Sequence, residues 1–166
     1  MPHTFETILD TPESYSANHV LVRLVDGLGF RFYWATKGLE EADFQFRPAM
    51  GLMSIEELIS HIEDLCFMSY ETFSVENIER TGSNPQDSIT SALSFLSSLK
   101  DILLKLEDMD LNEYKIKGFP IWNLINGPLA DALTHVGQIN SYRRMNGNPC
   151  PNVSVFIGKP KSSRTT

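Results

Sequence analysis

Cysteine is scarce in this sequence of 166 residues, which contains two thiols, Cys66 and Cys150. Two cysteines are too few for a disulfide framework, and a chain of this length can bury enough apolar surface to fold without one. Cys66 has apolar neighbours in Ile62, Leu65 and Phe67, so we expect its thiol to be buried and unreactive. Cys150 lies between two prolines, in an expected exposed loop.

Long apolar runs and an excess of positive charge are also missing. No stretch approaches the ~20 consecutive apolar residues of a membrane-spanning helix, and residues 1–10 lack the basic and apolar segments of a signal peptide. Lysine and arginine total 14 against 21 aspartates and glutamates, a net charge of −7. This balance disfavours binding to the phosphates of nucleic acids. We therefore expect a cytoplasmic protein that binds neither membranes nor nucleic acids.

Helical periodicity is the main pattern that is present. Apolar residues recur every three or four positions in four segments, which clusters of proline, glycine and asparagine separate. The pattern predicts helices over about residues 14–39, 54–74, 87–107 and 121–145, and only residues 153–157 alternate as a strand would. The sequence therefore predicts one all-α domain over residues 1–166, a four-helix bundle. Its clearest apolar stripes are Leu21, Leu24, Leu28, Phe32, Ala35 and Leu39, and Ile89, Ala92, Leu96, Leu99, Leu103 and Leu106.

Local signals mark several ends of these helices. Ser54 with Glu57 three positions later is a capping box for the second helix. In the fourth, Gly127 and Pro128 either kink the helix or mark its start, with Asn126 as the cap. Residues 74–86 form a polar loop long enough to cross the bundle, which leaves the connectivity open. We expect the proline-rich tail, residues 148–166, to be extended and its last residues, 161–166, to be disordered.

One polar stripe lies beside the apolar seam of the fourth predicted helix. Asp131, His135, Gln138 and Tyr142 follow one another at spacings of four, three and four, so they share one side of the helix. His61 lies at the rim of the apolar face of the second helix. An aspartate that is ionised inside a bundle is costly unless it is paired, and a cation shared with two imidazoles would satisfy it. Spacing alone leaves open the alternative that each is an ordinary surface or hydrogen-bonded core residue.

Aromatic and cationic residues near these helices allow two interpretations each. We expect the polar stripe to face a substrate pocket lined by Trp34, Trp122, Gln138 and Tyr142. The alternative for Trp34 is that it only packs within the bundle and contacts no substrate. Arg31, between two phenylalanines, either extends its charge out of an apolar face into water or binds an anionic ligand.

Four segments carry a resemblance to a known family. They are FRP (residues 46–48), MSIEELISHI (53–62), PIWNL (120–124) and LADALTHVGQI (129–139). Over nearly its whole length the chain resembles the DinB/YfiT-like metalloenzymes, which are four-helix bundles. The resemblance implies a metal site with one histidine from the second helix and two, four residues apart, from the fourth. His61 and His135 match this pattern, and Asp131 stands where the family has a histidine, which makes the site harder and more negative.

The resemblance also implies a function. It implies a divalent metal, zinc or nickel, in an enzyme that acts on a small molecule, a hydrolase or a thiol-dependent transferase. Metal-bound water or thiol would be the nucleophile. Relatives often pair, so a homodimer is expected, but their reactions differ and the substrate stays open. The alternative is a non-catalytic bundle that binds a ligand or partner, with a vestigial or absent metal site.

Overall fold

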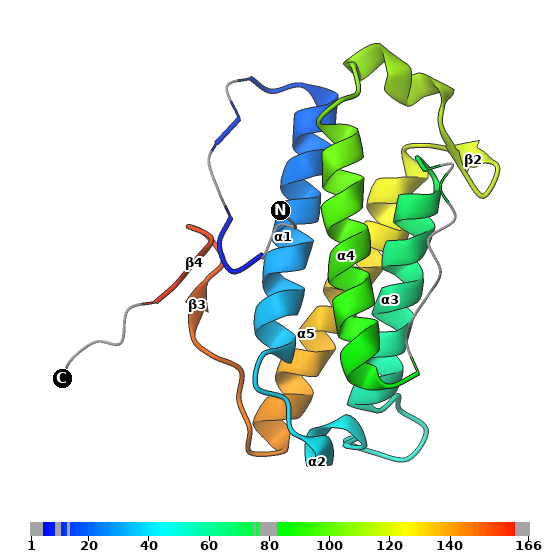
Figure 1. Cartoon of the computed structure of the whole chain (residues 1–166). Coiled ribbons are helices and arrows are strands. Elements are labelled where there is room, and N and C mark those ends of the chain that lie inside the picture. Colours follow the sequence, from blue (N-terminus) through cyan, green and yellow to red (C-terminus); the bar gives the residue numbers. More distant parts are fainter. Residues whose placement is uncertain (1–4, 9–10, 13, 75, 77–82, 162–166) are drawn as a thin grey trace.

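The fold is known from a computed structural model, which describes residues 5–8, 11–12, 14–74, 76 and 83–161. Four long helices run side by side: α1 (Ala17–Thr36), α3 (Ile55–Glu71), α4 (Pro85–Leu103) and α5 (Ala130–Met145) (Figure 1). The described chain is mostly helical, so the prediction of an all-α fold is confirmed. Within these ranges no helix is both long and apolar enough to cross a bilayer. Of the end expected to be disordered, residues 162–166 lie outside the described residues, as do residues 75 and 77–82 of the predicted crossing loop.

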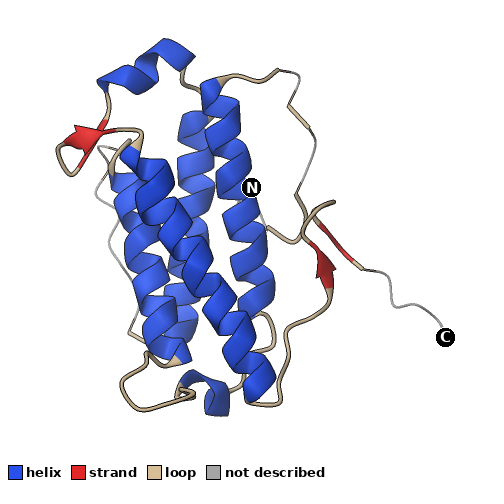
Figure 2. Ribbon diagram, turned by 180° about the vertical axis from the view of Figure 1, so that it is seen from behind, coloured by secondary structure: helices blue, strands red, loops and turns tan. Residues whose placement is uncertain are grey.

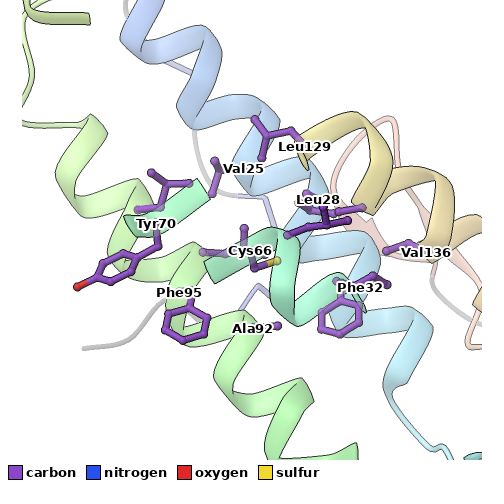
Figure 3. Close-up of a cluster of buried hydrophobic side chains, with 14 of the residues drawn as sticks. Val25, Leu28, Phe32, Cys66, Tyr70, Ala92, Phe95, Leu129 and Val136 are labelled. Carbon is purple, nitrogen blue, oxygen red and sulfur yellow. The ribbon is translucent and has the colours of Figure 1, made fainter. Parts of the chain in front are cut away.

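The four long helices enclose one apolar core. Each packs against two others, since α1 and α3 both contact α4 and α5. Most residues of the two clearest apolar stripes are buried, and Leu24, Leu39 and Leu106 are partly buried. Figure 3 shows Leu28, Phe32, Phe95 and Val136 among the side chains that meet in this core. Cys66 is buried among them as expected, and desolvation raises the pKa of its thiol, which keeps the thiol protonated.

The start of α3 follows from its capping residues. The Ser54 hydroxyl accepts a hydrogen bond from the Glu57 N–H at 3.2 Å, and the Glu57 carboxylate accepts one from the Ser54 N–H at 2.6 Å. The predicted capping box is therefore confirmed. The hydrogen bond from the Ser54 N–H also holds the pKa of Glu57 below its ordinary value. The helix ends at Glu71, three residues before the predicted end at residue 74.

A widened turn precedes α5 and decides between the two interpretations of Gly127 and Pro128. Residues Ile125–Leu129 form the π-helix η2, in which the Ala130 N–H reaches back five residues to the Ile125 carbonyl. Pro128 has no N–H to give to an ordinary helical turn, and Gly127 leaves helical geometry with φ −88° and ψ −112°. The chain is helical at Asn123 and Leu124, kinks at η2, and continues as α5 from Ala130, directly before Asp131.

Short elements that the apolar pattern did not predict connect the long helices. Helix α2 (Glu41–Phe44) lies between α1 and α3. After α4 come the 3-10 helix η1 (Asp108–Glu113) and an antiparallel pair of strands, β1 (Lys115–Ile116) and β2 (Phe119–Pro120). These elements are two to six residues long, too short to show a period in the sequence.

The C-terminal tail, expected to be extended, contains a hairpin. Strand β3 (Val153–Ser154) pairs antiparallel with β4 (Lys159–Pro160), and the hairpin lies beside the helices at one edge of the molecule (Figure 2). The Ile8 N–H donates to the Gly158 carbonyl at 2.9 Å. Gly158 has φ +64°, and a Cβ there would lie 2.4 Å from the Cβ of Ile8, so glycine is required at this contact. The hairpin is thus attached to the N-terminal segment.

A buried arginine joins the last turns of α1 and α5. The Arg143 side chain is almost fully buried and donates to the carbonyls of Ala35 at 2.7 Å, Lys37 at 2.9 Å and Gly38 at 3.2 Å. Its Nε–H donates to the carbonyl of Asn148. Carbonyls at a helix C-terminus have no partner within the helix, so Arg143 caps α1 from a distant part of the chain.

Candidate metal centre

The three predicted ligands come together between α3 and α5. His61 lies near the middle of α3, while Asp131 and His135 lie on successive turns of α5, and the two helices pack against each other. One ligand atom from each residue lies within 4.8 Å of the others. The described part of the chain therefore contains a His–Asp–His cluster that could hold a metal ion.

The spacing of the ligand atoms fits a small divalent ion. His61 Nε2 lies 3.4 Å from Asp131 Oδ2, and His135 Nε2 lies 3.3 Å from Asp131 Oδ1. The two imidazole rings meet edge to face with centroids 4.7 Å apart. Donor atoms around a tetrahedral zinc ion at the usual bond lengths are separated by about 3.4 Å. The two distances, one to each oxygen of Asp131, are close to that separation, and one ligand atom from each residue lies within 4.8 Å of the others. Two nitrogens with one carboxylate are donors that zinc and nickel accept.

A hydrogen bond between Gln138 and His135 orients the imidazole ring. His135 Nδ1 lies 2.8 Å from Gln138 Oε1, and an amide oxygen only accepts, so Nδ1 donates in this pair. In the neutral imidazole the other nitrogen, Nε2, then carries a lone pair and faces the Asp131 carboxylate, which also only accepts. A cation, a proton or a water molecule between these two acceptors would satisfy both. Metal-binding histidines are oriented by hydrogen bonds of this kind.

The cluster is open to solvent on one side. The side chain of His135 is 15% exposed, whereas those of His61 and Asp131 are 37% and 48% exposed. Three protein ligands with an accessible side leave room for water or substrate, which is typical of catalytic rather than structural zinc sites. A cavity of about 480 Å³ adjoins Asp131, lined mainly by the η2 segment and by Leu65 and Met68 of α3.

The four predicted pocket residues lie in different surroundings. Gln138 contacts His135, as described above. Tyr142 is buried and meets Phe46 edge to face at 6.3 Å. Trp122 is 72% exposed in the turn before η2. None of the four lines the cavity beside Asp131.

Trp34 has contacts that attach it to the N-terminal segment. Its indole N–H donates to the Glu6 carbonyl at 3.1 Å, and its ring packs edge to face against Tyr33 and lies under the Lys37 ammonium. These contacts agree with the alternative interpretation, in which Trp34 has a packing role. A substrate pocket that includes all four residues stays a prediction.

Glu57, four residues before His61 on α3, has its carboxylate occupied elsewhere. It caps α3 through Ser54 and lies 3.4 Å from the Arg47 guanidinium. Asp131 is therefore the carboxylate that the fold presents to the two histidines.

The sequence pattern placed Gln138 in the predicted pocket but did not predict its contact with His135. The spacing of three residues on one side of a helix was the signal that could have shown it.

Comparison of the chain with models of protein families, with curated proteins and with solved structures gave no match. The class of protein therefore follows from fold and site alone. It is an all-α protein with a His–Asp–His cluster, between two packed helices, that could hold a metal ion.

Proposed function

We propose that the chain is a four-helix bundle of the DinB/YfiT-like type and a metal-dependent enzyme that acts on a small molecule. The observation that carries the proposal is the convergence of His61, Asp131 and His135, which come from two helices and face one another across a partly open site. The arrangement of four long helices and the resemblance of the segments around these residues support the same family. The reaction belongs to the hydrolase or thiol-dependent transferase class.

In this proposal His61, Asp131 and His135 hold a divalent ion, zinc or nickel. The bound ion would supply a Lewis acid that lowers the pKa of an attached water or thiol toward neutrality. The chain itself contributes orientation and charge. Gln138 orients His135 through their hydrogen bond, and the carboxylate of Asp131 adds a negative charge that the family's usual histidine lacks. The cavity beside Asp131 offers space to a small substrate.

Metal content tests this proposal directly. The protein should be purified without a histidine tag or added metal and examined by elemental analysis, and its crystals by anomalous scattering. We expect about one zinc or nickel per chain at the three ligands. His61→Ala should lose the ion, whereas His19→Ala, an imidazole removed on α1, should keep it. Chelator-stripped protein that binds neither Zn²⁺ nor Ni²⁺ in a calorimetric titration would overturn the proposal in favour of a non-catalytic bundle.

Catalysis needs a second measurement. Metal-loaded and metal-free protein should be compared on panels of small hydrolysable esters and amides, and on electrophiles offered with a low-molecular-weight thiol. We expect turnover in one of the panels that depends on the ion and is lost in His61→Ala. Stoichiometric metal without turnover in either panel would support a metal-binding but non-catalytic protein.

A further inference from the structure

A second hollow lies between α1, α5 and the C-terminal hairpin. Two adjoining cavities, of about 660 Å³ and 470 Å³, share the lining residues Arg23, Gly27, Arg31 and Val155. The hairpin, which lies beside the helices at the edge of the molecule in Figure 1, forms one wall of the larger cavity. Volumes of this size are typical of sites for small molecules. We call the two cavities together the α1–α5 groove.

The α1–α5 groove concentrates positive charge on an acidic protein. Arg23, Arg31 and Lys159 line it, and among the described lining residues there is no aspartate or glutamate. The whole chain carries a net charge of −7, so the cations of Arg31 and Lys159 around one hollow contrast with the average charge of its surface. Such a groove raises the local concentration of small anions.

The position of Arg31 depends on a glycine one turn earlier. Arg31 Nη1 donates to the Gly27 carbonyl at 3.1 Å. A Cβ at residue 27 would lie 3.2 Å from that nitrogen, so glycine leaves the space in which the guanidinium lies. Because a guanidinium has five N–H donors, this bond leaves others for an anion in the groove.

Asn140 provides a polar group that the fold does not use. Its Oδ1 is buried and has no hydrogen-bond partner in the part of the chain that the structure describes, and the residue lines the smaller cavity. A buried amide without a partner costs free energy, which a bound ligand with a hydrogen-bond donor would recover.

Gly137 also lines the groove, and no close contact with a neighbouring residue requires a glycine at this position. It lies in the middle of α5, where glycine is less stable than alanine by about 1 kcal/mol. A Cβ at this position would meet nothing within 4 Å, so the helix could carry a larger residue there. The missing side chain instead keeps the floor of the groove open.

We propose that the α1–α5 groove binds a small organic anion, with its carboxylate or phosphate group at Arg31 and a hydrogen-bond donor of the molecule at Asn140. This site goes beyond the proposed metal-dependent function. Asn140 is nine residues from Asp131, which is about 180° around a helix of 100° per residue, so the two sites use opposite sides of α5.

Nuclear magnetic resonance titration of the full chain tests the proposal. Inorganic phosphate and succinate are the two probes, and sodium chloride at matched ionic strength is the control. We expect saturable shifts of the Arg31 side-chain N–H and the Asn140 side-chain amide with one probe or both. A larger response to phosphate or to succinate identifies the head group. Shifts that rise linearly, or that chloride reproduces, would overturn the proposal.

Variants separate this site from general charge effects. Arg31→Gln should weaken binding about tenfold or more, because a charge-assisted hydrogen bond is lost. Arg144→Gln removes the same charge from an exposed position of α5 outside the groove and should leave binding unchanged. Asn140→Asp should abolish anion binding by repulsion, and a folded circular dichroism spectrum of the variant is the condition for the comparison. Equal affinities in the parent, Arg31→Gln and Asn140→Asp would show that the anion binds elsewhere.

Discussion

Asp131 is the residue that distinguishes the candidate metal centre from the histidine triad that the resemblance implies. It lies within 3.4 Å of both His61 and His135. Asp131→Ala should therefore abolish tight metal binding, while Asp131→His should restore it and shift the preference toward softer, nitrogen-loving ions. Calorimetric titration of each variant with Zn²⁺, Ni²⁺ and Mn²⁺ measures this. If Asp131→Ala binds Zn²⁺ as tightly as the parent, Asp131 is not a ligand.

Gln138 acts on the ion only through His135. Replacing it with leucine removes the acceptor that holds Nδ1–H, so His135 loses its orientation. We expect Gln138→Leu to weaken metal binding by about 10–100-fold without abolishing it. The dissociation constant from competition with a chelator checks this. Ser141→Ala, which removes an exposed hydroxyl bonded to the Gly137 carbonyl, is the matched control and should have no effect. An unchanged constant for Gln138→Leu would mean that His135 is held by packing alone.

At the scale of the elements, Arg143 is the main link between the ends of α1 and α5. Arg143→Met keeps most of the buried volume but removes its hydrogen bonds to Ala35, Lys37, Gly38 and Asn148. Because buried carbonyls would lose charged donors, we expect the free energy of unfolding to fall by about 3 kcal/mol or more. Urea denaturation followed by circular dichroism measures the loss. Arg144→Met, at an exposed position, should change stability by less than about 0.5 kcal/mol, and equal effects of the two variants would contradict the capping role.

Asp43 ties helix α2 to the end of α5 and makes this junction sensitive to acid. Burial raises the pKa of its carboxyl, but hydrogen bonds from the Glu40 N–H and from the Asn148 and Asn146 side chains outweigh burial, so the pKa lies below its ordinary value of 3.8. The unfolded chain therefore binds this proton more readily. The stabilisation is complete above about pH 4 and is lost as the pH falls through the native pKa.

The variant Asp43→Asn tests this pH dependence. It removes the titrating group, so the parent should be the more stable protein at neutral pH and its advantage should shrink below about pH 4. Urea midpoints of both proteins, measured from about pH 6 down to about pH 3, give the comparison. If the difference between the two urea midpoints stays constant over this range, Asp43 stabilises the fold through its packing and hydrogen bonds rather than through its charge.

At the scale of the whole molecule, the expected homodimer stays a prediction. Several large apolar side chains are exposed, among them Phe156 at 95% and Trp122 at 72%. Contacts between copies would remove such side chains from water. We expect sedimentation equilibrium at tens of micromolar protein to give twice the mass of one chain. Monomer alone at that concentration would end this prediction.

The positions of the long helices could be predicted because their signals are local. Apolar residues at spacings of three and four define the buried stripes of α1 and α4, and the residues of one capping box define the start of α3. The ends were less certain. The kink at η2 had two interpretations, since a proline near a helix start is compatible with both. Residues 153–157, the one strand-like stretch in the sequence, contain β3, but its pairing with β4 was missed because each strand has only two residues.

For the candidate site, the sequence by itself determined that Asp131, His135 and Gln138 share one side of a helix, because helical geometry fixes neighbours three and four residues apart. Tertiary structure alone decided that His61, 70 residues from Asp131, faces this stripe. It also decided that Arg143 caps α1 and that the hairpin closes the α1–α5 groove. These contacts depend on how whole helices pack, and packing arises from the shapes of many side chains together rather than from a repeating pattern along the chain.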